Sequence, residues 1–396
     1  MEIHGDKAVA FCGTRGVPAN YGGFETAVDE ISHRFVERGR DCVVFCRKSA
    51  GGKVLEVHGG RRLIYVTGSS ARALDTFVSA FQTGWHLLRH RERYGHVFWF
   101  NNANLPGILL TLLAGLPVSV NTDGMEWRRA KWSWPFKAYY FLSSFLISRL
   151  CGSLISDSRA IQDYYRKVFF KKTQFVPYGI PGTPPVAREK RREVLREYGL
   201  RPGRYFLQIT RFEPDNLVLE AAHAFRASRL CEDGFAFLLI GYQHDTPYAR
   251  RVKELQGRDG VRVASAVYDA GVLAVLRENC FCYVHGNTVG GTNPALLEAM
   301  EGCPRVLAVD GPFSREVVGE DGLFFTPDGM VNAFRDVLAR PAGPALRERA
   351  RSLYQWDAVA EGYVRLTEGK PANYRPEKPG PARERPQRLA TKERGA

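Results

Sequence analysis

The fold of this chain is decided by residues 285–301, which read HGNTVGGTNPALLEAME. The apolar run just before them, CFCYVHG at 280–286, predicts a buried strand. Pro294 suits the first turn of a helix, and Asn293 suits its N-cap. Glycines let the backbone approach an anion closely, and a helix N-terminus offers free N–H groups and the positive end of its dipole. The segment therefore predicts a strand, a glycine loop and a helix suited to a phosphorylated ligand.

Glu298 falls about one turn into this predicted helix. A carboxylate does not attract phosphate, but it accepts hydrogen bonds from ribose hydroxyls. The residues fit an ordinary strand-to-helix turn with a solvent-facing Glu298 equally well. The chemistry of this segment by itself leaves both interpretations open.

A similar alternation of strands and helices fills the rest of the chain. Near the start, AVAFCG at 8–13 predicts a strand, and a glycine-rich turn and a helix from Phe24 to Arg38 follow it. The proline- and glycine-rich segment 176–188 reads as a linker. We therefore expect an α/β protein with two Rossmann-like domains of parallel strands. The expected divisions are 1–180, 181–368 and a disordered basic tail at 369–396.

The net charge of +14 is concentrated in two segments, 128–172 and 369–396. A basic balance suits nucleic acid, an anionic membrane surface or an anionic substrate. The chain has neither zinc-finger spacing nor an RNA-binding signature, so nucleic acid is not expected as a partner. The membrane surface and the anionic substrate remain.

The eight cysteines lie mostly in apolar runs and form no C-x2-C pair, which predicts buried free thiols in a reducing compartment. The polar start 1–7 does not resemble a signal peptide, and no apolar run reaches the roughly 18–20 residues of a membrane span. We expect a cytoplasmic protein, either free or peripheral on the inner face of the cell membrane.

Four blocks of sequence resemble one family of enzymes. They are GTRGVPANYGGFET at 13–26, NTDGMEWRRAKW at 121–132, ITRFEPDN at 209–216 and the segment 285–301. Together they resemble retaining glycosyltransferases of family 4, in a subgroup similar to bacterial rhamnosyltransferases, from about residue 8 to about residue 366. The resemblance implies the GT-B fold, in which two Rossmann-like domains face each other across a cleft, and hexosyltransferase activity.

The resemblance also implies which residues bind the nucleotide-sugar donor. The family pairs two glutamates with seven residues between them; Glu298 matches the second, and Gly290 stands in the place of the first. Arg211 matches an arginine that contacts the diphosphate, and Asn216 stands where the family has a lysine. Both departures look like traits of the subgroup. The implied donor-binding residues are Gly22, Gly23, Arg211, Asn216, His285, Gly290, Gly291, Thr292, Asn293 and Glu298.

The block 121–132 is expected on the acceptor side. Asp123 is the favoured group to orient or deprotonate an acceptor hydroxyl, and Glu126 is its rival. A second set of residues in this block is basic and aromatic. It could bind an anionic acceptor or membrane headgroups, or it could be a solvated basic surface with tryptophans packed below. This set is Trp127, Arg128, Arg129 and Lys131. The aromatic and basic residues at 134–172 suggest docking on anionic lipid, and a core helix is the plainer interpretation of 136–149.

The sequence thus predicts a retaining transferase that moves a sugar, with rhamnose suggested by the subgroup. The donor would be a nucleotide diphosphate-sugar, and the acceptor a surface polysaccharide or a polyprenyl-diphosphate-linked oligosaccharide. No D-x-D occurs, so neither a metal nor a cofactor is expected, and Arg211 would help to neutralise the leaving diphosphate. The alternatives are a nucleotide-sugar epimerase of the same fold and a non-catalytic, membrane-associated nucleotide-sugar-binding protein. An NAD-dependent oxidoreductase is disfavoured because the first strand lacks G-x-G-x-x-G.

Overall fold

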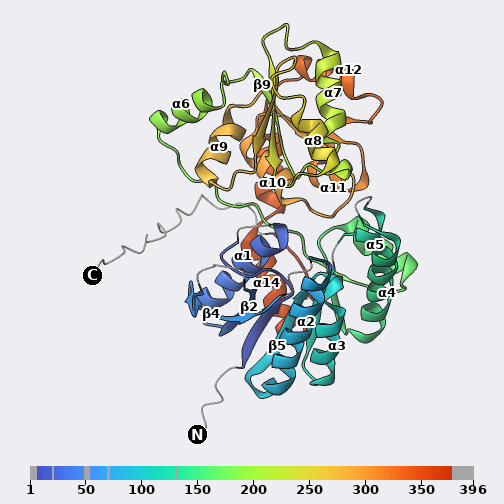
Figure 1. Cartoon of the computed structure of the whole chain (residues 1–396). Helices are drawn as coiled ribbons and strands as arrows, with labels where there is room; N and C mark the ends of the chain where they lie inside the picture. The colour runs from blue at the N-terminus through green and yellow to red at the C-terminus, as the bar shows by residue number, and fades with distance from the viewer. Residues whose placement is uncertain are drawn as a thin grey trace.

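The computed structural model describes residues 7–19, 22–48, 54–68, 72–122, 124–129 and 132–376. The chain forms two lobes, each with a central sheet flanked by helices (Figure 1). This arrangement confirms the predicted α/β class with two Rossmann-like domains. The central strands of these sheets are short and largely buried, as expected where helices cover both faces of a parallel sheet.

The first sheet has eight strands in the order β3-β4-β2-β1-β5-β6-β7-β8. All neighbours run parallel except β3 and β4. The strands are β1 (Ala8–Cys12), β2 (Cys42–Arg47), β3 (Val57–His58), β4 (Arg61–Val66), β5 (Tyr94–Phe100), β6 (Val118–Asn121), β7 (Ser153–Ser156) and β8 (Gln174–Phe175). The order reverses beside β1, and the loops that follow β1 and β5 therefore open at a topological switch point.

The helices of the first domain are α1 (Gly23–Glu37), α2 (Arg72–Arg89), α3 (Leu105–Leu113), α4 (Trp134–Leu150) and α5 (Arg159–Val168). Helix α1 buries one apolar face, in which Phe35 meets Phe11 edge-on with 5.5 Å between ring centroids. Among the described residues, no helix combines the length and the apolar composition that a membrane crossing requires.

The second sheet is wholly parallel, in the order β11-β10-β9-β12-β13-β14. Its strands are β9 (Tyr205–Ile209), β10 (Ala236–Tyr242), β11 (Val261–Ser265), β12 (Cys282–His285), β13 (Val306–Val309) and β14 (Leu323–Phe325). Its helices are α6 (Arg188–Glu197), α7 (Val218–Ser228), α8 (Pro247–Lys253), α9 (Ala270–Asn279), α10 (Pro294–Gly302), α11 (Pro312–Val318), α12 (Met330–Asp336) and α13 (Ala345–Leu353). All eight cysteines of the chain are free thiols, and seven of them are buried.

The last helix, α14 (Trp356–Thr367), returns to the first domain and lies beside α1 (Figure 1). Tyr363 packs on Phe98 at 4.9 Å between ring centroids and accepts a hydrogen bond of 2.6 Å from Asn121 Nδ2. Asp357 pairs with Arg34 at 2.7 Å. The predicted division 181–368 includes this helix, but its apolar face is buried against the first sheet. Spacing along the chain does not reveal which sheet a helix covers, so the sequence could not separate α14 from the second domain.

The beginning of the tail is ordered, contrary to the expectation of disorder throughout 369–396. Ala372 is buried and its N–H donates to Gln174 Oε1 at 3.2 Å. Tyr374 meets the Phe175 ring edge-on at 6.0 Å. This hydrogen bond and this ring contact attach the start of the tail to the edge strand β8. Residues 377–396 lie outside the described residues.

We predict that Tyr363→Phe lowers the free energy of unfolding by about 1–2 kcal/mol, because the buried Asn121 amide loses its partner. Chemical denaturation followed by tryptophan fluorescence measures this loss. Tyr268→Phe serves as the control, since Tyr268 is exposed, and we expect a change within about 0.5 kcal/mol. Equal stability of Tyr363→Phe and the natural protein would contradict a structural role for this hydrogen bond.

Candidate active site

The strand, loop and helix predicted from residues 285–301 are present. Strand β12 ends at His285, and α10 begins with Pro294 as its first residue. Asn293 caps the helix, since its Oδ1 accepts a hydrogen bond of 2.9 Å from the N–H of Ala295. Capping by a neutral amide leaves the positive end of the helix without a negative charge of its own.

Two loops of the first domain lie directly against this segment. A Cβ on Gly124, in the loop after β6, would lie 3.0 Å from Gly290 Cα. Gly290 has φ +150°, a conformation that favours glycine. A Cβ on Gly23, at the start of α1, would lie 3.1 Å from Pro294 Cγ. Of the predicted glycines, Gly23 thus lies against the second domain and Gly290 against the first. Gly22 is the N-cap of α1, next to Gly23.

The loop after β7 completes this junction through Asp157. The Thr292 hydroxyl donates to the backbone carbonyl of Asp157. A Cβ on Gly291 would overlap the Asp157 carboxylate. Asp157 was not among the residues expected from the sequence. Its position directly after a buried strand, where the carboxyl ends of parallel strands meet, is the signal that could have pointed to it.

The loop after β9 lies on the other side of the segment. Thr288 donates from its N–H at 2.9 Å and from its hydroxyl at 3.0 Å to the carbonyl of Asp215. In this loop the Arg211 side chain is 49% exposed. Asn216 is buried and donates from Nδ2 to the Arg211 carbonyl at 2.7 Å. Asn216 therefore fixes the shape of the loop, and the half-exposed Arg211 side chain lies 3.9 Å from the Glu213 carboxylate.

Glu298 and His285 occupy different environments. Glu298 is one-quarter exposed and forms an ion pair with Arg277 of α9. His285 is buried, and burial lowers the pKa of its imidazole to about 3, so the ring is neutral at physiological pH. It stacks on Tyr283 with 6.4 Å between ring centroids. A neutral imidazole can donate or accept a hydrogen bond, whereas it adds no charge beside a diphosphate.

The expected acceptor block divides into buried and exposed members. The buried Glu126 carboxylate is held by Arg129 on one oxygen and by Trp132 Nε1, at 2.9 Å, on the other. Arg129 also reaches the carbonyl of Val289 in the second domain at 3.4 Å. Both Glu126 oxygens thus serve the fold of the loop, which disfavours Glu126 as a base.

Trp127 and Arg128 belong to an aromatic cluster on the outside of this loop. Trp127 is half-buried and lies 5.8 Å from the Phe141 ring. Arg128 is exposed and lies over the Tyr164 ring at 5.7 Å. Asp123 and Lys131 lie outside the described residues.

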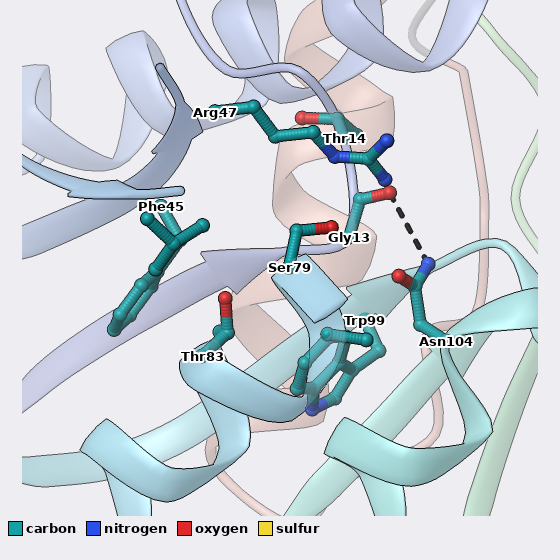
Figure 2. A pocket seen from close by; sticks show the side chains of 10 residues that line it. Gly13, Thr14, Phe45, Arg47, Ser79, Thr83, Trp99 and Asn104 are labelled. Carbon is teal, nitrogen blue, oxygen red and sulfur yellow. Dashed lines mark hydrogen bonds between the residues drawn. The ribbon is translucent and has the colours of Figure 1, made fainter. Parts of the chain in front are cut away.

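A small polar cavity opens at the carboxyl ends of β1, β2 and β5 beneath α2 (Figure 2). The space inside it is at most about large enough for one water molecule. Asn104 donates from Nδ2 to the Gly13 carbonyl at 3.2 Å, while its buried Oδ1 has no hydrogen-bond partner among the described residues. Such a group is suited to a bound water. Sequence reasoning missed this cavity because its lining comes from five separate segments, namely Gly13, Thr14, Phe45, Arg47, Val66, Ser79, Ala80, Thr83, Trp99 and Asn104.

We predict that Gly291→Ala weakens the contact between the domains, because its methyl group would overlap the Asp157 carboxylate. The expected loss of unfolding free energy is roughly 1–3 kcal/mol, with an increased radius of gyration in small-angle X-ray scattering. Gly311→Ala is the matched control in the same domain, since no atom lies within 4 Å of the added methyl group. Similar behaviour of the two variants would refute the close approach at Gly291.

Comparison with known proteins supports the same architecture. A domain of unknown function, DUF1972, matches residues 6–181. Sucrose-phosphate synthase from Thermosynechococcus elongatus superposes with a TM-score of 0.74 and 18% identity, over 92% of this chain and 98% of that one. A glycosyltransferase from Rickettsia africae gives a TM-score of 0.68 and 14% identity, over 92% and 99% of the chains.

HepE from Anabaena, in complex with UDP-glucose, gives a TM-score of 0.71 and 14% identity, over 92% of this chain and 99% of that one. At such identities a superposition demonstrates the fold. The chain therefore has the GT-B fold, with two Rossmann-like domains that face each other, as the sequence predicted.

Proposed function

We propose that this protein is a glycosyltransferase that moves a sugar from a nucleotide diphosphate-sugar to a saccharide acceptor. One observation carries the proposal: the glycine loop before α10 contacts the loop that carries Arg211 and also approaches three loops of the first domain. HepE was crystallised in complex with UDP-glucose, which supports a donor of this class for a chain of the same fold.

The donor's diphosphate would lie at the start of α10. The side of Gly290 on which a Cβ would stand has no atom within 4 Å, and the start of α10 presents the positive end of its dipole. The half-exposed Arg211 supplies a positive charge. As the bond to the sugar breaks, negative charge develops on the leaving diphosphate, and these groups stabilise it. They support a transfer in which protein groups, without a metal, neutralise the leaving group.

Glu298 would accept hydrogen bonds from the ribose hydroxyls, and the neutral His285 would contact the sugar. On the acceptor side we propose Asp123, since it precedes Gly124, which approaches Gly290 closely. Its carboxylate would orient or deprotonate the attacking hydroxyl. The resemblance to rhamnosyltransferases supports retention of configuration, rhamnose as the sugar, and a surface polysaccharide or lipid-linked oligosaccharide as the acceptor.

A membrane-facing surface on the first domain would bring such a lipid-linked acceptor within reach. Thirteen of the fifteen exposed large apolar side chains among the described residues belong to residues 54–170. Helix α4 exposes a stripe at helical spacing, and this stripe continues past α5. We call this the apolar face: Trp134, Phe141, Leu142, Phe145, Leu150, Val168 and Phe170.

Basic residues border the apolar face. Arg149 lies over the Phe145 ring at 5.3 Å, and Arg166, Lys167 and Lys172 are exposed near Phe170. Phe141 meets Phe169 at 5.3 Å, which joins α4 to the end of α5. Apolar side chains that insert among headgroups, with cations around them, are typical of proteins bound to an anionic membrane surface. We therefore propose that the protein works at the inner face of the cell membrane.

We predict that Arg211→Ala reduces turnover roughly 100-fold, because the leaving diphosphate loses a charged partner. Glu298→Ala is expected to reduce kcat/KM roughly tenfold or more, through loss of ribose contacts. The assay follows release of nucleoside diphosphate from a panel of nucleotide-sugars in the presence of membrane lipid extract, with the product identified by mass.

The control for both variants is Arg229→Ala. Arg229 is an exposed residue at the C-terminal end of α7, at the opposite end of the sheet from the candidate site. Full activity of Arg211→Ala and Glu298→Ala would overturn the site assignment. Turnover without release of nucleoside diphosphate would favour an epimerase, and a lack of transfer with every donor would favour a binding protein.

We predict that the protein sediments with vesicles of anionic phospholipid at low salt and much less with neutral vesicles. The double variant Trp134→Ser, Phe170→Ser should bind at least about tenfold more weakly, since two large apolar side chains no longer insert. The matched control changes the two exposed apolar side chains of the second domain, as Tyr268→Ser, Leu338→Ser. Equal binding by both double variants would argue against the apolar face.

A further inference from the structure

The Glu298 carboxylate is held by an arginine that has no role in the reaction proposed above. Arg277 of α9 donates from Nη2 to Glu298 Oε2. The Arg277 side chain is 10% exposed, whereas that of Glu298 is 25% exposed. The arginine thus lies behind the carboxylate, and the carboxylate is the more accessible partner of the pair. In the described part of the chain, Arg277 Nε has no hydrogen-bond partner.

The packing of α9 on α10 fixes this geometry. A Cβ on Gly302 would lie 3.1 Å from Arg277 Cβ, so the two helices touch where the arginine side chain begins. Gly302 and Glu298 are four residues apart and share one face of α10. The Arg277 side chain therefore starts beside the last turn of α10 and extends toward its N-terminus. It carries its guanidinium about one helical turn nearer to the glycine loop.

We infer that Arg277 is a positioning residue for the nucleotide, acting through Glu298; this inference rests on the proposed function. A carboxylate near the diphosphate would repel it, and the paired guanidinium offsets that charge. The same contact occupies Oε2 and restricts the rotation of the carboxylate. Oε1, to which no described residue donates a hydrogen bond, is left to accept from the ribose hydroxyls.

A second ion pair on the same helix provides the comparison. Glu301 lies three residues after Glu298 on α10 and pairs with Arg351 of α13 at 2.5 Å. Its carboxylate is 10% exposed, and it lies in the last turn of α10, farther from the glycine loop. Both pairs fasten α10 to a neighbouring helix. The Arg277 pair alone involves the residue proposed to meet the ribose.

The experiment measures nucleotide affinity by calorimetry with UDP, GDP, ADP and TDP, each beside its counterpart without the ribose hydroxyls. We expect the natural protein to prefer the hydroxylated form of its best ligand roughly tenfold or more. In Arg277→Met the affinities for the two forms should differ by no more than about twofold. Arg277→Lys keeps the cation but not the planar fork, so an intermediate preference of about threefold is expected. Arg351→Met should keep the natural preference, whatever stability it loses.

Each outcome decides the matter. A natural preference in Arg277→Met overturns the inference, as does an equal loss of preference in Arg351→Met, since both show that Arg277 only stabilises α10. If Arg277→Met does not fold, then Arg277→Lys decides, and an unchanged preference in it overturns the inference. Should the natural protein bind none of the diphosphates, the proposed function fails and takes this inference with it. Binding with equal affinity for both forms overturns the inference alone.

Discussion

The approach of Gly291 to the Asp157 carboxylate limits how the two domains meet. A side chain at position 291 would overlap that carboxylate, and a Cβ on Gly124 would lie 3.0 Å from Gly290 Cα. The two backbones therefore approach more closely than ordinary residues allow. This contact brings the loops after β6 and β7 to the start of α10, so that groups of both domains surround one small region. The candidate active site exists because of this constraint.

Two further contacts maintain the same arrangement from the sides. The Glu316 carboxylate of α11 accepts hydrogen bonds of 2.8 and 3.0 Å from the N–H of Arg159, at the start of α5 in the other domain. A negative charge at the N-terminus of α5 is also favoured by the helix dipole. On the far side, Tyr363 of α14 anchors the end of the chain on β6 through Asn121. Both attachments are polar, and the second holds the helix with which the chain returns to the first domain.

Much of the fold could be predicted from the sequence because its signals are local. The buried strands are short apolar runs, and Asn293 and Pro294 mark the start of α10 through chemistry confined to adjacent residues. The candidate site was less accessible to such reasoning. Asp157 and Arg277 act on groups that lie far from them in the sequence, so no spacing pattern connects them to the site.

The spacing of residues along the sequence also does not show in which direction each side chain points. Asn216 and Glu126 lie in the expected loops, yet both side chains turn inward, where one holds the Arg211 carbonyl and the other holds Arg129 and Trp132. A motif identifies the loop that reaches a ligand, but the packing beneath it decides which side chain remains outside. Asn216 and Arg211 lie five residues apart in one loop, but the Asn216 side chain is buried and the Arg211 side chain is half exposed.

The distribution of charge and apolar surface connects these details to the proposed activity. The second domain keeps its exposed surface almost free of large apolar side chains and presents Arg211 and the start of α10 to an anion. The first domain carries the apolar face and its basic border. An enzyme that joins a water-soluble nucleotide-sugar to an acceptor anchored in lipid needs this division, because one domain must meet solvent and the other a membrane. The glycine contact joins the loops of these two different domains at the candidate site.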